Sequence, residues 1–116
     1  MTQEIEAVGV IEVFGFVTAI TAADAAAKAA DVRVIALDSN KPANPDAVEV
    51  PLIMCVKVQG SVSAVTAAVE AGAQAAKSVS GVIQTHIIPR PTEDTEKMAL
   101  RCSVGRDKVG HIKNNA

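Results

Sequence analysis

Two histidines and two cysteines are the side chains best suited to metal binding or nucleophilic catalysis in this sequence: His86, His111, Cys55 and Cys102. No pattern of metal-ligand spacing joins either histidine to a cysteine, so no metal site is predicted. His86 alternates with its neighbours in a strand pattern, which favours a surface or interface position. Cys55 stands in an apolar run and is expected to act as a small hydrophobe, because a catalytic thiol needs an electropositive setting and a partner base.

Carboxylates and glycines offer no second route to catalysis. Glu6, Glu12 and Glu49 do not form a spaced carboxylate pair. Gly9 and Gly15 lack the helix-opening pattern that follows a phosphate-binding glycine loop. We therefore predict that the chain is not an enzyme and uses no cofactor. An enzyme built on one of the two cysteines stays open as an alternative, which alkylation or a cysteine-to-alanine change would test.

Composition narrows the class of partner. The 116 residues suit one domain, and 49% of them are hydrophobic although only 2% are aromatic. A formal charge of −2 gives no electrostatic footprint for nucleic acid. No stretch approaches the ~20 apolar residues of a membrane span, and the acidic N-terminus lacks a signal-peptide pattern. We expect a cytoplasmic protein that binds neither nucleic acid nor membrane, and its small apolar side chains favour oligomerisation.

Hydrophobic periodicity predicts strands over about 6–13, 32–37, 52–58 and 81–88 and helices over 16–30 and 92–100, with a second helix that begins after Ser61. Ser61 and Thr92 are the expected N-caps. Three prolines predict a loop over 38–51 that can enter no helix. Residues 1–100 would form one domain, and the last residues, 101–116, a polar tail.

Each of the two longer helices is expected to have one dry face. In the first, the predicted inward residues are Phe16, Ile20, Ala23, Ala27 and Ala30, opposite Thr21, Asp24, Lys28 and Asp31. In the second, they are Val62, Val65, Val69, Ala73 and Ala76, opposite Ser63, Thr66, Glu70, Gln74 and Lys77.

A faint internal repeat relates these helices, because residues 19–23 recur in similar form as residues 64–68. Two successive strand–helix–strand units predict the ferredoxin-like βαββαβ plan of the α+β class. Two helices would then cover one face of a four-stranded antiparallel sheet. RNA-binding domains share this plan, but they need aromatic residues on the sheet that this chain lacks.

Five segments in order and spacing resemble the shell domain of bacterial microcompartments (the BMC domain), from about residue 6 to residue 98. They are Glu6–Gly15, Ala22–Asp24 with Lys28, Gln59–Val65, Ala71–Ala73 and His86–Pro91. The resemblance implies a homohexamer whose flat discs tile, with other hexamers and shell proteins, into a layer around metabolic enzymes in the cytoplasm. It also implies a pore for small metabolites on the six-fold axis, lined by the turn between the second and third strands.

The resemblance further assigns the contacts between hexamers. Lys28 matches the family's edge lysine, and Arg90 matches the arginine of its Pro-Arg-Pro motif. Asp31 stands where an asparagine is common near this edge. Without the resemblance, Lys28 is simply a residue of a solvated helix face and Arg90 a charge at a strand end.

The pore segment departs most from the family pattern. It is longer by several residues and lacks glycine, and the pore-lining candidates are Ser39, Asn40, Lys41, Glu49, Val50, Pro51 and Leu52. Asp38, Lys41, Asp46 and Glu49 sum to −2 per chain, and to −12 for six copies if all of them lie near the axis, which suggests a pore less welcoming to anions. Alternatively, the insertion folds onto one disc face and leaves the constriction to Val50, Pro51 and Leu52.

One further reading has the same fold but another function. Ferredoxin-like regulatory domains oligomerise as dimers or trimers and sense metabolites at subunit borders, with a long loop as the switch. Solution mass and electron microscopy would separate such a sensor from a hexameric tile.

Overall fold

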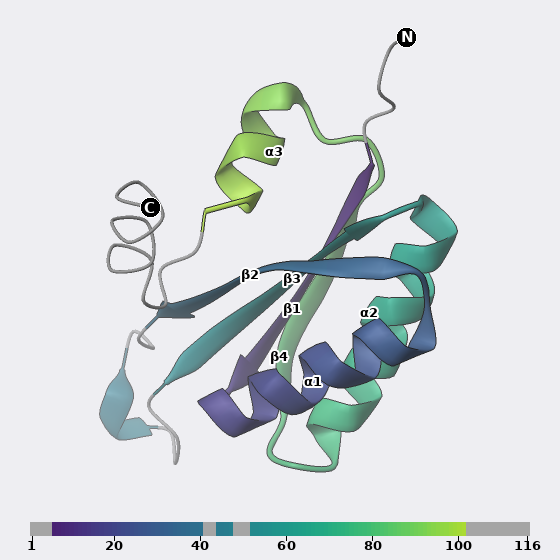
Figure 1. Cartoon of the computed structure of the whole chain (residues 1–116). Coiled ribbons are helices and arrows are strands. Elements are labelled where there is room, and N and C mark those ends of the chain that lie inside the picture. Colours follow the sequence, from purple (N-terminus) through teal and green to yellow (C-terminus); the bar gives the residue numbers. More distant parts are fainter. Residues whose placement is uncertain (1–5, 41–43, 48–51, 102–116) are drawn as a thin grey trace, which may run out of the picture.

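A computed structural model describes residues 6–40, 44–47 and 52–101 of the chain (Figure 1). The elements in chain order are β1 (Ala7–Phe14), α1 (Phe16–Ala29), β2 (Val32–Asn40), the 3₁₀ helix η1 (Pro45–Ala47), β3 (Ile53–Gly60), α2 (Val62–Lys77), β4 (Val82–Ile88) and α3 (Glu93–Ala99). Within these ranges, no helix is long and apolar enough to span a membrane.

The four strands form one antiparallel sheet in the order β2-β3-β1-β4. Helices α1 and α2 cover one face of it, so the predicted α+β class and βαββαβ plan are confirmed (Figure 1). The register defines two ends. At the Phe14 end, Phe14 pairs with Ile53 and Ile53 with Asn40; at the Ala7 end, Ala7 pairs with Gly60 and Gly60 with Val32. Helix α1 runs from the Phe14 end to the Ala7 end, and α2 runs back.

The core lies between the sheet and the two long helices and consists of small and branched aliphatic side chains. Its largest fully buried members on the strands include Ile11, Met54 and Val56. Gly72 of α2 sits at the closest approach, because a Cβ built there would lie 2.6 Å from Ile11 Cδ1 and 3.0 Å from the carbonyl oxygen of Ala22. The lack of a side chain at this position lets α2 pack close against both β1 and α1.

The predicted inward face of α1 is wrong at several positions. Phe16, Ile20 and Ala27 are exposed, whereas the side chains that pack inward are those of Thr18, Ala19, Ala22, Ala23 and Ala26. Alanine is the commonest residue of this helix, so periodicity offers little contrast to fix its rotation. The close α1–α2 contact accepts only small side chains and turns the larger ones outward.

The dry face of α2 is largely confirmed, because Val65, Val69 and Ala76 are buried and Ala73 is half-buried. Val62 is the exception and is exposed. It stands in the first turn, where the helix begins to leave β3.

Both predicted N-caps are present. The Ala64 N–H donates to Ser61 Oγ (3.1 Å) and the Thr95 N–H donates to Thr92 Oγ1 (3.2 Å). At the start of α1, Gly15 has a φ of 91°, a conformation that favours glycine, and its N–H donates to the carbonyl of Leu52 (2.8 Å).

The expected loop over 38–51 is wrong in two respects. Strand β2 continues to Asn40, and Pro45–Ala47 forms a short 3₁₀ helix. A proline fits the first position of a helix, where its missing N–H would have no helical partner. Residues 41–43 and 48–51 lie outside the described residues.

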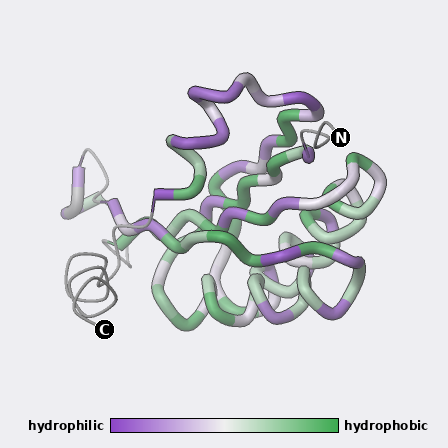
Figure 2. The backbone as a smooth tube through the Cα atoms, turned by 45° about the horizontal axis from the view of Figure 1, so that its top comes forward, coloured by the Kyte–Doolittle hydropathy of each residue, from purple (hydrophilic) through white to green (hydrophobic). Residues whose placement is uncertain are grey.

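The other face of the sheet, which we call the open face, carries α3. Figure 2 shows α3 as a mostly hydrophilic segment across the sheet from α1 and α2. Val8 on this face and Pro91, in the segment that leads into α3, are both almost fully buried. Helix α3 therefore covers the open face near the Ala7 end.

Candidate functional site

The predicted pore residues that the structure describes lie at the Phe14 end. Ser39 and Asn40 end β2, pair with Met54 and Ile53, and are exposed. Leu52 is half-buried, and its carbonyl is held by Gly15. The other candidates, Lys41, Glu49, Val50 and Pro51, lie outside the described residues, as do Cys102 and His111.

The three predicted edge residues lie at the opposite, Ala7 end. Lys28 is in the last turn of α1, Asp31 lies between α1 and β2, and Arg90 follows β4 directly. The strand register brings these segments to one end, because Val32 pairs with Gly60 and Ile88 pairs with Val8. All three side chains belong to exposed residues.

Lys28 forms an ion pair with Asp24 one helical turn earlier (Nζ–Oδ2, 2.8 Å). The two side chains are 75% and 60% exposed. A pair this exposed contributes little to stability and is readily exchanged for another partner. Lys28 is thus available for a contact outside its own chain.

Four polar side chains form a partly buried connection that sequence reasoning missed; we call Glu6, Arg33, Gln59 and Glu96 the Gln59 network. Arg33 ion-pairs with Glu6 through its guanidinium and donates from Nη2 to Gln59 Oε1 (3.3 Å). Gln59 Nε2 donates in turn to Glu96 Oε2 (3.1 Å). Gln59 is only 5% exposed. The network joins β2, β3 and the residue before β1 to α3.

Electrostatics follow this geometry. The hydrogen bond from Arg33 lowers the pKa of Glu6, and the bond to Glu6 raises the pKa of Arg33. Both shifts favour the charged forms, so the pair stays ionised near neutral pH. Alternation along β2 and β3 would have placed Arg33 opposite Gln59, but no sequence pattern points to Glu96 as the third partner.

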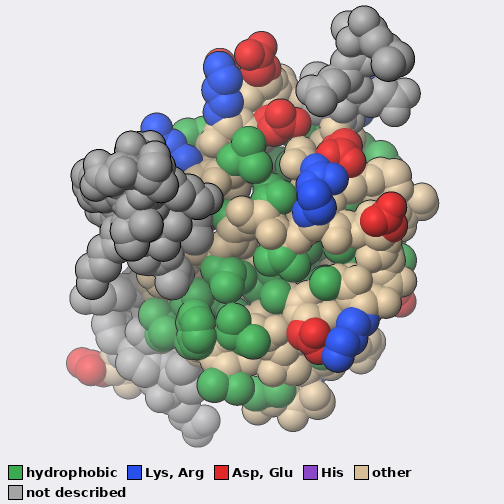
Figure 3. Space-filling model, viewed as in Figure 1, with side chains coloured by type: hydrophobic (Ala, Val, Ile, Leu, Met, Phe, Trp, Pro, Cys, Tyr) green, Lys and Arg blue, Asp and Glu red, His purple; other side chains and the backbone are tan. Residues whose placement is uncertain are grey.

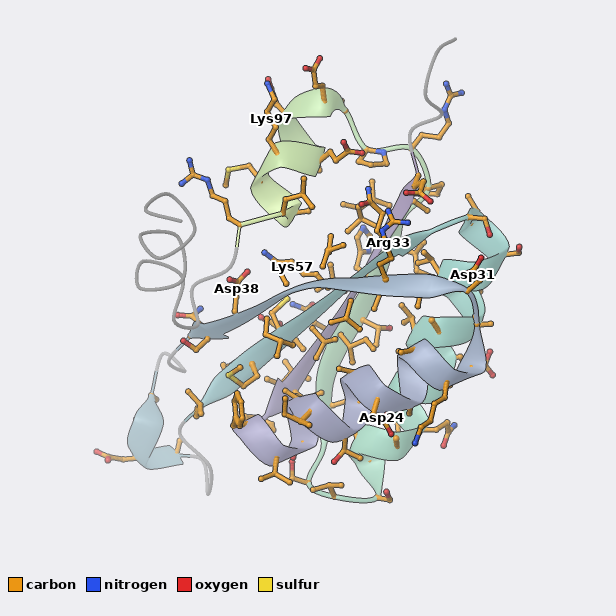
Figure 4. The ribbon with its side chains drawn as sticks, in the orientation of Figure 1. Asp24, Asp31, Arg33, Asp38, Lys57 and Lys97 are labelled. Atoms are coloured by element: carbon orange, nitrogen blue, oxygen red, sulfur yellow. The ribbon has the colours of Figure 1, made fainter. Side chains whose placement is uncertain are left out.

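A second polar group on the open face contains Lys57, which ion-pairs with Asp38 and donates to the carbonyl of Arg101 (3.1 Å). Figure 4 shows the Lys57 and Asp38 side chains directed toward one another below α3. Cys55 lies near them on the same face, half-buried, and burial raises its pKa to about 11. A thiol with this pKa stays protonated at neutral pH and is a poor nucleophile.

Metal ligands do not gather in the described ranges, where no group of three or more His, Cys, Asp or Glu side chains could hold an ion. His86 lies exposed in β4 opposite Val10, as its strand pattern predicted.

The two flanks of the molecule carry exposed apolar side chains. The α1/β2 flank presents Phe16, Val17 and Ile20 at exposures of 46%, 69% and 44%. Figure 3 shows hydrophobic side chains gathered on the side of the molecule that α1 and β2 form. On the α2/β4 flank, Val79 and Ile83 are exposed.

A shallow groove of about 310 Å³ lies between α2 and β4 on the second flank. Its floor is partly apolar, and its rim carries the polar face of α2. The lining residues are Thr66, Val69, Glu70, Ala73, Gln74, Lys77, Thr85 and Ile87. The α1/β2 flank thus exposes apolar side chains, and the α2/β4 flank carries a groove.

Comparisons with known proteins converge on one family. Residues 7–91 match the model of the BMC domain. Over 93 residues the sequence is 40% identical to "Bacterial microcompartment shell protein PduA" of Citrobacter freundii, covering 80% of this chain and 90% of that protein. Over 94 residues it is 36% identical to "Bacterial microcompartment shell protein EutM" of Escherichia coli K12, covering 80% and 87%.

Among solved structures, the fold is similar to a microcompartments protein from Desulfitobacterium hafniense DCB, with a TM-score of 0.63 and 27% identity. The match covers 82% of this chain but 47% of that one, so this chain spans about half of its length.

Proposed function

Because the chain belongs to the BMC-domain family and is a shell protein of bacterial microcompartments, we propose that six copies close into a ring and that rings meet at their rims to form a layer. The role is structural rather than catalytic. The arrangement of the sheet supports this plan: the pore candidates among the described residues, Ser39, Asn40 and Leu52, lie at the Phe14 end and the edge candidates at the Ala7 end. Strands that run along the radius of a disc would place the first set at its axis and the second at its rim.

In such a ring the two flanks of the molecule meet. A closed ring with more than two copies needs a head-to-tail interface, in which different surfaces of neighbouring copies face each other. The α1/β2 flank of one copy would face the α2/β4 flank of the next. Phe16, Val17 and Ile20 lie at the axis end of α1, and Val79 and Ile83 lie at the axis end of the other flank. This pairing would remove the exposed apolar surface of both flanks from water.

At the rim, we propose that Lys28, Asp31 and Arg90 contact the neighbouring ring. Within the described part of the chain, the ion-pair partner of Lys28 is Asp24. Both side chains of this pair are exposed. Exchanging it for acceptors on the neighbour costs little. Arg90 projects from a segment fixed at both sides, by the Ile88–Val8 pairing before it and by buried Pro91 after it.

At the axis, we propose that the segment from Ser39 to Leu52 lines a pore for small molecules. The charged residues of this segment, Lys41, Asp46 and Glu49, sum to −1 per chain, and this charge would disfavour anions if these residues face the axis. Should the insertion instead fold onto a disc face, Val50, Pro51 and Leu52 would form an uncharged constriction. Enclosed enzymes and other shell proteins are the partners that this role implies. The family assignment argues against the alternative of a metabolite-sensing regulatory domain.

A pair of matched variants tests the ring. Val17→Glu introduces a charge at a side chain that is 69% exposed in the single chain and that would be buried in the proposed ring. Met98→Glu makes the same change at a side chain that is 65% exposed on α3, away from both flanks. We expect Val17→Glu to yield a folded species of lower mass by light scattering, while Met98→Glu keeps the mass of the wild type. Equal masses for all three proteins would contradict the flank pairing.

A further inference from the structure

The amide of Gln59 occupies a position that few other side chains could fill. It lies next to last in β3, on the open face, between a guanidinium and a carboxylate. The Arg33 guanidinium can only donate hydrogen bonds, and the Glu96 carboxylate oxygen accepts one here. A glutamine supplies one acceptor and one donor on the same group, and thereby satisfies both neighbours from a residue that is only 5% exposed.

Helix α3, which contains the Glu96 partner of this amide, makes few other contacts with the sheet. None of the seven residues of α3 is buried, and Met98 is 65% exposed. A seven-residue helix is too short to be stable without tertiary contacts. The bond from Gln59 to Glu96 holds α3 against the open face, and the bond from Lys57 to the Arg101 carbonyl holds the chain two residues after α3 ends. Burial of Pro91 fixes the point where the segment leaves β4.

We infer that Gln59 is a positioning residue for the rim of the disc: its amide fixes α3, and α3 in turn fixes the direction in which Arg90 leaves the sheet. This inference rests on the proposed rim contact of Arg90. Arg90 lies three residues before the first residue of α3, and Pro91 between them is buried, so α3 can redirect Arg90 only by displacing Pro91 from its buried position. We expect that displacement once α3 loses its bond to Gln59. The angle at which two rings meet would then depend on a partly buried hydrogen bond between β3 and α3 as well as on the contact residues themselves.

Exchanging the two members of the bond provides a sharp test. Gln59→Glu places a carboxylate against Glu96, which leaves two acceptors of like charge without a donor between them. The double variant Gln59→Glu/Glu96→Gln restores one donor and one acceptor, and keeps the total charge of the wild type. Gln84→Glu is the matched control: Gln84 Nε2 donates to Glu12 Oε1 (2.7 Å) on the same face of the sheet, away from α3.

Two measurements read the result in the assembled protein. Hydrogen exchange is followed at the amides that the α3 segment protects, those of Glu96, Leu100 and Arg101. We expect these amides to exchange at least about tenfold faster in Gln59→Glu, and at the wild-type rate in the double variant and in Gln84→Glu. Electron microscopy is expected to show that Gln59→Glu loses or curves the flat sheets while its mass stays that of the wild type, and that the double variant restores them.

The outcomes separate the inference from the proposal beneath it. Unchanged α3 exchange in Gln59→Glu, or no recovery in the double variant, overturns the positioning role. Faster exchange with unaltered sheets also overturns it, because the rim would then be indifferent to α3. If Arg90→Ala assembles like the wild type, the rim role of Arg90 fails, and the exchange data still report whether Gln59 holds α3.

Discussion

Gly72 lies where α2 approaches both the sheet and α1, and replacing it with alanine tests whether this approach is as tight as the structure indicates. The added Cβ would stand 2.6 Å from Ile11 Cδ1, 3.0 Å from the carbonyl oxygen of Ala22 and 3.5 Å from Ala26 Cβ. Ile11, Ala22 and Ala26 are fully buried. The first contact is closer than atoms tolerate, and the second involves a backbone oxygen that no rotamer change can move.

Two opposing effects decide whether Gly72→Ala raises or lowers the free energy of unfolding. Alanine is favoured over glycine inside a helix by about 1 kcal/mol. Overpacking a well-filled core typically costs about 1–3 kcal/mol. Because one of the contacts is to backbone, we expect overpacking to win, with a net loss of about 1–2 kcal/mol in the free energy of unfolding.

Ile11→Val removes the Cδ1 atom that the new methyl group meets, and on its own costs about 0.5–1.5 kcal/mol. In that background, Gly72→Ala should cost about 1 kcal/mol less than in the wild type, since the two changes share one contact. Urea denaturation of all four proteins at a single subunit concentration measures the cycle, because association adds to apparent stability. Stabilisation by Gly72→Ala, or an equal cost in both backgrounds, would refute the tight approach.

Four further results are expected. Lys28→Ala should abolish sheets under the electron microscope while the mass and the urea midpoint barely change, and intact sheets would exclude the rim role. In a Cys102→Ser background at pH 8, Cys55 should alkylate roughly a hundredfold more slowly than an ordinary thiol, since burial raises its pKa to about 11; a rate near that of a free thiol would contradict the burial. Glu6→Gln should lower the free energy of unfolding by up to about 1 kcal/mol at neutral pH, because the lowered pKa of Glu6 stabilises the fold at pH values above the ordinary carboxyl pKa of 4.5. The difference between variant and wild type should vanish as the pH falls through the lowered pKa. A difference that does not depend on pH would refute the ion pair. Glu49→Gln should increase anion passage through the assembled layer, and unchanged passage would defeat the charge hypothesis for the pore.

The strands, the caps and the split βαβ plan could be predicted because each has a strong local signal. Alternation of branched residues marks β1 and β3, and Ser61 and Thr92 stand one residue before their helices. The rotation of α2 followed from its valines, which contrast with its polar positions. Local pattern and tertiary packing agree in these elements.

The rotation of α1 could not be predicted in the same way. Its alanines give no contrast, and its largest apolar side chains, such as Phe16, point away from the core of the single chain. If these side chains meet a neighbouring copy, their hydrophobicity serves an interface rather than the interior, and a rule that buries large residues inside one chain then selects the wrong face.

The Gln59 network was also beyond the reach of sequence patterns. Its four residues come from β2, β3, α3 and the residue before β1, so only the register and the return of the chain over the open face bring them together. Each residue alone reads as an ordinary polar position. The burial of Gln59, which distinguishes it from the others, appears only once α3 has been placed.

The native mass of the wild-type chain tests the ring most directly. Native mass spectrometry at micromolar concentration is expected to give one dominant species at six times the 11.9 kDa of the single chain. A dominant monomer, or an assembly of any other number of copies, would contradict the six-fold ring and with it the placement of the pore and rim residues.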